Sequence, residues 1–212
     1  MQYQLNLVDF KYKEVFVQLY VPDAIQIQQQ YNGAGNEMMF PYWSKIWPAA
    51  FALSQFLINN QHYIQNKKVM ELAAGLALPS MVAAKFTAAV SFSDHSDDAV
   101  SIASLSAQKN HFKNALGNVL DWKELRFPLN ADVVLMSDIN YEPGNFDELY
   151  NLIDQLLRDN KLIILSTPQR LLAKPFIEKL LPQTIQKKNI DIYENDILNS
   201  VTVLVLHSQK DI

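Results

Sequence analysis

Residues 69–79 read Val69-Met70-Glu71-Leu72-Ala73-Ala74-Gly75-Leu76-Ala77-Leu78-Pro79, and this stretch decides the fold. It begins as an apolar strand, passes through a turn of small residues and opens into a helix, which tolerates Pro79 in its first turn. A nucleotide-like ligand can approach such a turn closely because little side chain stands in the way. Only Gly75 of the expected glycines is present, so a tight connection without a ligand is the competing interpretation.

Downstream of this turn, strand-like and helix-like segments alternate. The pattern predicts strands over residues 68–72, 88–93, 116–120, 132–137, 161–166, 187–193 and 201–207, and helices over residues 79–86, 96–110, 146–158 and 171–181. Such alternation predicts an α/β fold: a Rossmann-like, seven-stranded, mainly parallel sheet with helices on both faces. The last two strands lack an intervening helix, so we expect them to pair antiparallel.

The segment before this alternation has a different character. We expect residues 1–46 to form a small N-terminal cap, with short strands at 3–8 and 14–20, and residues 47–212 to form the main domain, which starts with a helix over 49–59. The polar, Gln-rich residues 22–36 are predicted to be a mobile loop.

Composition narrows the class of protein. The chain has 212 residues, of which 49% are hydrophobic and 19% are charged, as is ordinary for one globular domain. A net charge of -4 and the absence of a basic tail argue against a nucleic-acid partner. We find no signal peptide, no membrane-spanning run and no cysteine, so we expect a cytoplasmic protein without a membrane partner. The four histidines lack metal-ligand spacing, so no metal site is predicted.

Three predicted strand ends carry polar or small residues, and ligands of open α/β sheets bind at such ends. The first is the turn at Gly75. The second is Asp94, which follows Gly75 by 19 residues, close to the roughly 20 expected for a carboxylate that binds ribose hydroxyls. The third is the run from Ser137 to Pro143, which contains Asp138, Asn140 and Tyr141. The alternatives are an ordinary neighbour of a helix N-cap for Asp94 and a loop bonded to its own backbone for the third run.

With these residues assembled, the chain resembles the class I, seven-strand S-adenosylmethionine-dependent methyltransferases over about residues 37–207. More narrowly, it is similar to the protein-lysine methyltransferases of the electron-transfer-flavoprotein β-subunit and calmodulin group, and to nicotinamide N-methyltransferase-like proteins. The motifs that carry the resemblance are Trp47-Pro48-Ala49-Ala50 with Leu53, the run Glu71–Pro79, Leu120-Asp121-Trp122 and Ser137-Asp138-Ile139-Asn140-Tyr141. Ala73 and Ala77 depart from the family motif, which has glycine at both positions.

The resemblance implies S-adenosylmethionine as the cofactor. It assigns the cofactor-binding residues as Trp47, Glu71, Ala73, Gly75, Asp94, Asp121, Trp122 and Ser137, and the catalytic residues as Asp138, Tyr141 and Asn140. In this assignment Asp94 holds the ribose, Asp121 and Trp122 flank the adenine, and Trp47 closes over the cofactor. Asp138 and Tyr141 face the methyl group.

Three functions remain open at this point. The first is N-methylation of a lysine side chain in a protein, and the second is N-methylation of a small, nicotinamide-like amine. The third is a non-catalytic scaffold with a degenerate cofactor site, because Ala73 and Ala77 replace glycines. The sequence leaves the acceptor, the number of methyl groups and the oligomeric state open.

Overall fold

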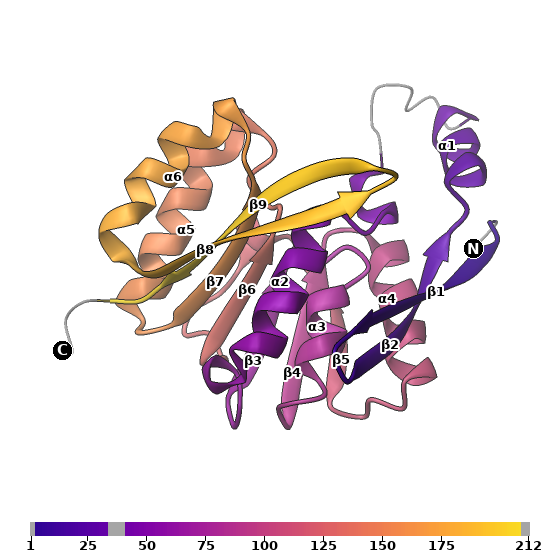
Figure 1. Cartoon of the computed structure of the whole chain (residues 1–212), viewed down its shortest axis with the longest axis horizontal. Helices are drawn as coiled ribbons and strands as arrows, with labels where there is room; N and C mark the ends of the chain where they lie inside the picture. Colours follow the sequence, from indigo (N-terminus) through magenta and orange to yellow (C-terminus); the bar gives the residue numbers. More distant parts are fainter. Residues whose placement is uncertain (1–2, 34–40, 209–212) are drawn as a thin grey trace.

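A seven-stranded sheet forms the centre of the molecule in the computed structural model, which describes residues 3–33 and 41–208 (Figure 1). Its strand order is β5-β4-β3-β6-β7-β9-β8. The strands are β3 (Lys68–Leu72), β4 (Ala89–Asp94), β5 (Ala115–Val119), β6 (Val133–Ser137), β7 (Leu162–Pro168), β8 (Thr184–Glu194) and β9 (Ile197–Leu206). The first five pair in parallel, whereas β9 runs antiparallel to both β7 and β8. The predicted α/β fold is therefore confirmed.

Helices cover both faces of this sheet. On one face lie α2 (Pro48–Asn59), α3 (Leu78–Ala83) and α4 (Asp97–Lys109), whose apolar residues share one core with the sheet. On the other face lie α5 (Phe146–Arg158) and α6 (Lys174–Leu180), which form a second core with the opposite side of β6 and β7. Ser96 caps α4 as its spacing predicts, with its hydroxyl accepting a hydrogen bond from Ala99 N.

Before the sheet, a hairpin of β1 (Leu5–Tyr12) and β2 (Val15–Pro22) forms a sheet of its own. Val17 and Leu19 are fully buried in the same core as α2 and α3. The edge of β2 that does not pair with β1 forms a hydrogen bond to α4, since Tyr20 N donates to Ser106 Oγ at 2.9 Å. This hairpin therefore packs on the main core, and the boundary at residue 46 stays a prediction.

One prediction for the N-terminal segment is wrong. Helix α1 (Ala24–Gly33) occupies most of the stretch expected to be a mobile loop, and residues 34–36 of that stretch lie outside the described part. Asp23 starts the helix, because its carboxylate accepts hydrogen bonds from Ile25 N and Gln26 N. Ile27 is buried against the rest of the chain, so packing holds a helix that its polar, Gln-rich sequence did not indicate.

Candidate active site

The turn after β3 follows a left-handed path at every second residue. Ala73, Gly75 and Ala77 have φ angles of +49°, +52° and +56°. This conformation costs an alanine roughly 1–2 kcal/mol, which explains why glycine is expected at these positions. At Gly75 an added Cβ would also lie only 3.3 Å from the carbonyl oxygen of Trp43. The turn therefore keeps its backbone close to a pocket that it lines with small side chains.

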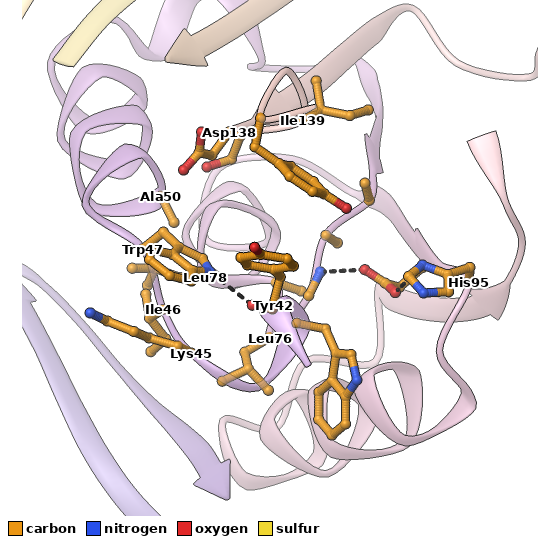
Figure 2. Close-up of a pocket in the computed structure, with 18 of the residues that line it drawn as sticks. Tyr42, Lys45, Ile46, Trp47, Ala50, Leu76, Leu78, His95, Asp138 and Ile139 are labelled. Carbon is orange, nitrogen blue, oxygen red and sulfur yellow. Dashed lines mark hydrogen bonds and ion pairs between the residues drawn. The ribbon is translucent and has the colours of Figure 1, made fainter. Parts of the chain in front are cut away.

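Asp94 ties this turn to the end of β4. Its Oδ2 accepts a hydrogen bond from Gly75 N at 2.9 Å, and its Oδ1 accepts one from Ser96 N at 3.0 Å. His95 Nδ1 lies 3.2 Å from the same Oδ1 (Figure 2). The residue is buried but lines the pocket, and Oδ2, with Gly75 N as its one hydrogen-bond donor among the described residues, keeps a second lone pair for a ligand hydroxyl. Asp94 thus holds the turn in place and also remains able to bind a ribose hydroxyl.

Asp138 comes directly after β6, the strand that pairs with β3 on the side away from β4. Its backbone is left-handed, with φ +53°, and its N–H donates to Ser166 O on β7. The carboxylate accepts two hydrogen bonds from one guanidinium, from Arg170 Nη1 at 2.6 Å and from Nη2 at 3.0 Å. Burial raises the pKa of the Asp138 carboxyl, and the charge and hydrogen bond of Arg170 oppose that rise. The result is a buried carboxylate paired with a partly exposed guanidinium at the pocket.

Aromatic rings from two distant segments meet beside Asp138. Tyr42 lies in the short helix η1 (Tyr42–Ser44), and its ring centroid is 4.9 Å from that of Tyr141 and 6.1 Å from that of Trp47. Trp47 Nε1 donates to Tyr42 O, and Lys45 Nζ lies 4.9 Å from the centre of the Trp47 ring. In Figure 2, Tyr42 lies in the middle of the pocket, with Trp47 and Asp138 to one side and His95 to the other.

A third group borders the pocket beyond Asp94. Leu120, Asp121 and Trp122 follow β5 and line the pocket, with Trp122 starting the short helix η3 (Trp122–Glu124). Asp121 Oδ1 accepts a hydrogen bond from Lys123 N, so the carboxylate has a fixed orientation. Trp122 is half-buried and offers an aromatic face to a base.

Nine of the eleven predicted site residues line this one pocket: Trp47, Ala73, Gly75, Asp94, Asp121, Trp122, Ser137, Asp138 and Tyr141. Glu71 and Asn140 do not. Glu71 is fully buried and its Oε2 accepts hydrogen bonds from Ser80 N and Ser80 Oγ at the start of α3. Asn140 is buried as well, and neither polar atom of its side chain has a partner among the described residues. Both side chains are therefore buried outside the pocket lining, and Glu71 instead ties the end of β3 to the start of α3.

Sequence reasoning missed Arg170, Tyr42, Lys45 and His95, all of which line the pocket. Arg170 follows the Thr167-Pro168 end of β7, so the rule of strand ends applies to it as well. The sequence does not indicate that Arg170 pairs with Asp138, because the two residues lie 32 positions apart with a helix between them. The aromatic group that contains Tyr42 is visible in the sequence but is equally consistent with a core.

The pocket combines an aromatic face, a carboxylate and a turn made mostly of small residues, which together suit a nucleoside ligand. It runs along four strand ends, from the aromatic face of Trp122 after β5, past the carboxylate of Asp94 at the end of β4 and the turn at Gly75 after β3, to Asp138 after β6. Among the described residues, no group of three or more metal-ligating side chains is found, and no helix is long and apolar enough to cross a membrane. This fold and this pocket define a class I methyltransferase that uses S-adenosylmethionine.

Comparison with known proteins places the chain within that class. Residues 36–183 match the family described as lysine methyltransferase, and the chain belongs to that family. The human histone-arginine methyltransferase METTL23 is 30% identical over 186 residues, covering 78% of this chain and 98% of the relative. The Xenopus tropicalis protein N-lysine methyltransferase METTL21A is 30% identical over 156 residues, covering 71% of this chain and 69% of the relative.

Solved structures agree on the fold. A 16S rRNA methyltransferase from T. thermophilus, solved with AdoMet and guanosine, has a TM-score of 0.65 at 13% identity. The match covers 97% of this chain and 51% of that chain. Magnesium protoporphyrin IX methyltransferase from Synechocystis, solved with bound SAM, has a TM-score of 0.57 at 15% identity, covering 87% of this chain and 97% of that one.

Proposed function

We propose that the chain transfers the methyl group of S-adenosylmethionine to a side-chain nitrogen of a protein, with lysine as the first candidate. The observation that carries this proposal is the carboxylate of Asp138, fixed at the end of β6 and bordered by the rings of Tyr42 and Tyr141. A buried anion beside aromatic faces favours a cationic or amine ligand. We also propose that the protein works in the cytoplasm, which its lack of cysteine supports.

The cofactor side of the pocket fits the proposed donor. In this proposal Asp94 accepts hydrogen bonds from the ribose and Trp122 stacks on the adenine, with Asp121 beside it, and all three residues line the pocket. Gly75 and its alanine neighbours let the tail of the cofactor pass close to the backbone. When bound, the cofactor supplies a methyl group that its sulfonium already activates.

The acceptor side then has to orient a neutral nitrogen. A lysine side chain has a reference pKa of about 10.4, so it enters the pocket as a cationic ammonium and must lose a proton to solvent before it attacks. Asp138 orients the amine by accepting its hydrogen bond. Burial raises the pKa of the Tyr141 phenol, and the charge of Glu142 adds to that rise, so the phenol stays neutral and its oxygen accepts a second bond. Holding the nitrogen in line with the methyl group supplies most of the acceleration.

Arginine is the second candidate acceptor. Asp138 already accepts two parallel hydrogen bonds from a guanidinium, so its position suits an arginine side chain as well as an amine. METTL23, a relative over most of this chain, is named as a histone-arginine methyltransferase.

Radiolabelled methyl transfer tests this proposal. The protein is incubated with labelled S-adenosylmethionine and a cell lysate, and the labelled proteins are hydrolysed and separated by amino-acid analysis. We expect the label in methyl-lysine, and label in methyl-arginine would select the second candidate. Label that passes only into the low-molecular-weight fraction would instead support a small amine as the acceptor.

S-adenosylhomocysteine supplies a matched binding test that needs no acceptor. A ligand that binds the native state raises the melting temperature by mass action. No rise at saturating ligand would contradict a working cofactor pocket and support the scaffold interpretation.

A further inference from the structure

The two charges that meet at Asp138 are held very differently. The Asp138 side chain is only 8% exposed, and its backbone is fixed by the hydrogen bond to Ser166 O. The Arg170 side chain is 38% exposed, and among the described residues its guanidinium forms hydrogen bonds and an ion pair with Asp138 alone. Arg170 is therefore the movable partner of a fixed carboxylate.

The segment that carries Arg170 is packed loosely on its far side. Leu171 and Leu172, the next two residues, are 91% and 74% exposed. A guanidinium that leaves Asp138 from this position enters water directly, where its hydration replaces the lost hydrogen bonds. The free-energy cost of separating the pair is therefore small for the Arg170 guanidinium.

The cost falls on Asp138 instead. A buried carboxylate that loses its partner keeps an uncompensated charge, which is strongly unfavourable. Lys45, another cation that lines the pocket, lies 3.0 Å from Glu194 on β8 and above the Trp47 ring, so it is engaged elsewhere. A ligand that brings its own positive charge can replace Arg170 without leaving Asp138 unpaired.

We propose, resting on the proposed function, that Arg170 is an internal competitor that occupies Asp138 until a cationic acceptor side chain displaces it. Arg170 then acts as a competitor at high local concentration, because it is tethered one strand away. A competitor of this kind weakens every acceptor by the fraction of time that it blocks the carboxylate. A free amino acid has too few contacts to overcome this penalty, whereas a docked polypeptide has more. Arg170 therefore selects for side chains presented by a protein.

Removing the competitor tests this idea with a small probe. Arg170→Ala is saturated with S-adenosylhomocysteine and titrated with methylguanidinium at millimolar concentration, and melting temperature is measured. We expect a saturable rise for Arg170→Ala and none for the unsubstituted protein. The double variant Arg170→Ala with Asp138→Asn is expected to show no rise, because it lacks the anion. Methylurea, which is neutral and of similar shape, is the matched ligand control.

Methyl transfer into lysate proteins gives a second readout. With Arg170→Ala we expect KM for lysate protein to fall about tenfold. This is the effect expected if Arg170 leaves Asp138 accessible about a tenth of the time and its removal leaves Asp138 accessible nearly all of the time. Methylguanidinium should then compete with the acceptor and inhibit the variant. Arg158→Ala, which removes a surface ion pair to Asp154 on α5, is the matched control for loss of an arginine.

The opposite result would overturn the proposal. If Arg170→Ala transfers methyl groups more slowly and methylguanidinium restores the rate, Arg170 is a fixed partner that orients Asp138. An absent methylguanidinium response in Arg170→Ala, with the S-adenosylhomocysteine response intact, also overturns it. Arg170→Gln, which keeps the size of the side chain, replaces the alanine variant if that variant does not fold. Loss of the S-adenosylhomocysteine response in the unsubstituted protein contradicts the proposed function itself.

Discussion

The ends of β3 and β6 lie side by side in the sheet but build the pocket by opposite means. After β3, four of the five residues from Ala73 to Ala77 are alanine or glycine, and the polar contacts of this turn come from the backbone, as in the hydrogen bond from Gly75 N to Asp94. After β6, Asp138 brings a charged side chain that pairs with Arg170. Both ends use left-handed residues to turn the chain sharply at the pocket.

This contrast indicates that the two strand ends have different roles in the pocket. The β3 end makes room, so it tolerates substitutions that keep the side chain small, and its alanines cost strain energy without adding bulk to the path of a ligand. The β6 end carries one charge, so in the proposed function it acts through a single carboxylate, that of Asp138, and its orientation. We therefore expect changes at the β6 end to affect catalysis and changes at the β3 end to affect stability and cofactor affinity.

The largest expected effect comes from Asp138→Asn. Asparagine tolerates the left-handed backbone at this position better than alanine does, so the substitution removes the charge with little added strain. We expect methyl transfer to fall at least about 100-fold, because the acceptor nitrogen loses its orienting anion. Initial rates with labelled S-adenosylmethionine measure this loss.

The control for this variant is cofactor binding. Asp138→Asn should keep the rise in melting temperature that S-adenosylhomocysteine causes, since the ribose and adenine side of the pocket is unchanged. Undiminished transfer would remove Asp138 from the catalytic assignment. Asp138→Ala is expected to lose transfer too, with an additional loss of stability from left-handed strain.

A smaller effect is expected behind the β3 end, where Glu71 is buried against Ser80. Burial raises the pKa of the Glu71 carboxyl to about 8, an effect that the hydrogen bonds from Ser80 oppose and the charge of Asp94 adds to. The unfolded chain has an ordinary glutamate pKa of about 4.3, so the folded state binds more protons between these two values. The free energy of unfolding should therefore fall, by a few kcal/mol in all, as the pH rises from about 4.5 to 8.

Glu71→Gln isolates this contribution, because the amide cannot ionise. Chemical denaturation from pH 5 to 8 should give a flatter pH dependence for the variant than for the unsubstituted protein. Two parallel curves would show that Glu71 ionises normally in the folded state.

The two strand ends also differ in how far the sequence predicts them. The apolar runs and their polar ends are enough to place Gly75, Asp94 and Asp138 at one edge of the sheet, since the parallel strands of such a fold end together. The partner of Asp138 could not be predicted in the same way. Arg170 belongs to another strand, and its pairing depends on the parallel register of Ser137 with Ser166, which no local pattern encodes.

Side-chain direction is the second limit of sequence reasoning. Glu71 lies two residues before the turn. Its neighbours Met70 and Leu72 face the core formed with α5 and α6, so the Glu71 carboxylate points to the opposite face, toward α3. Helix α1 was missed for a related reason, because the burial of Ile27 stabilises a segment whose composition suggested a loop.

The smallest expected effect is a gain in stability at the β3 end. Ala73→Gly relieves a left-handed alanine at φ +49°, where the strain is roughly 1–2 kcal/mol, and glycine loses part of this gain through its greater freedom in the unfolded chain. We expect a net increase of about 1 kcal/mol in the free energy of unfolding, measured by urea denaturation. Ala77→Gly should gain less, because Ala77 is fully packed in the core and loss of its methyl group leaves a void. Gly75→Ala makes the opposite change in the same turn, and should cost stability through both its φ of +52° and the contact with Trp43 O. If Ala73→Gly lost stability, the left-handed path would not be what strains this turn, and the two alanines would be its best residues.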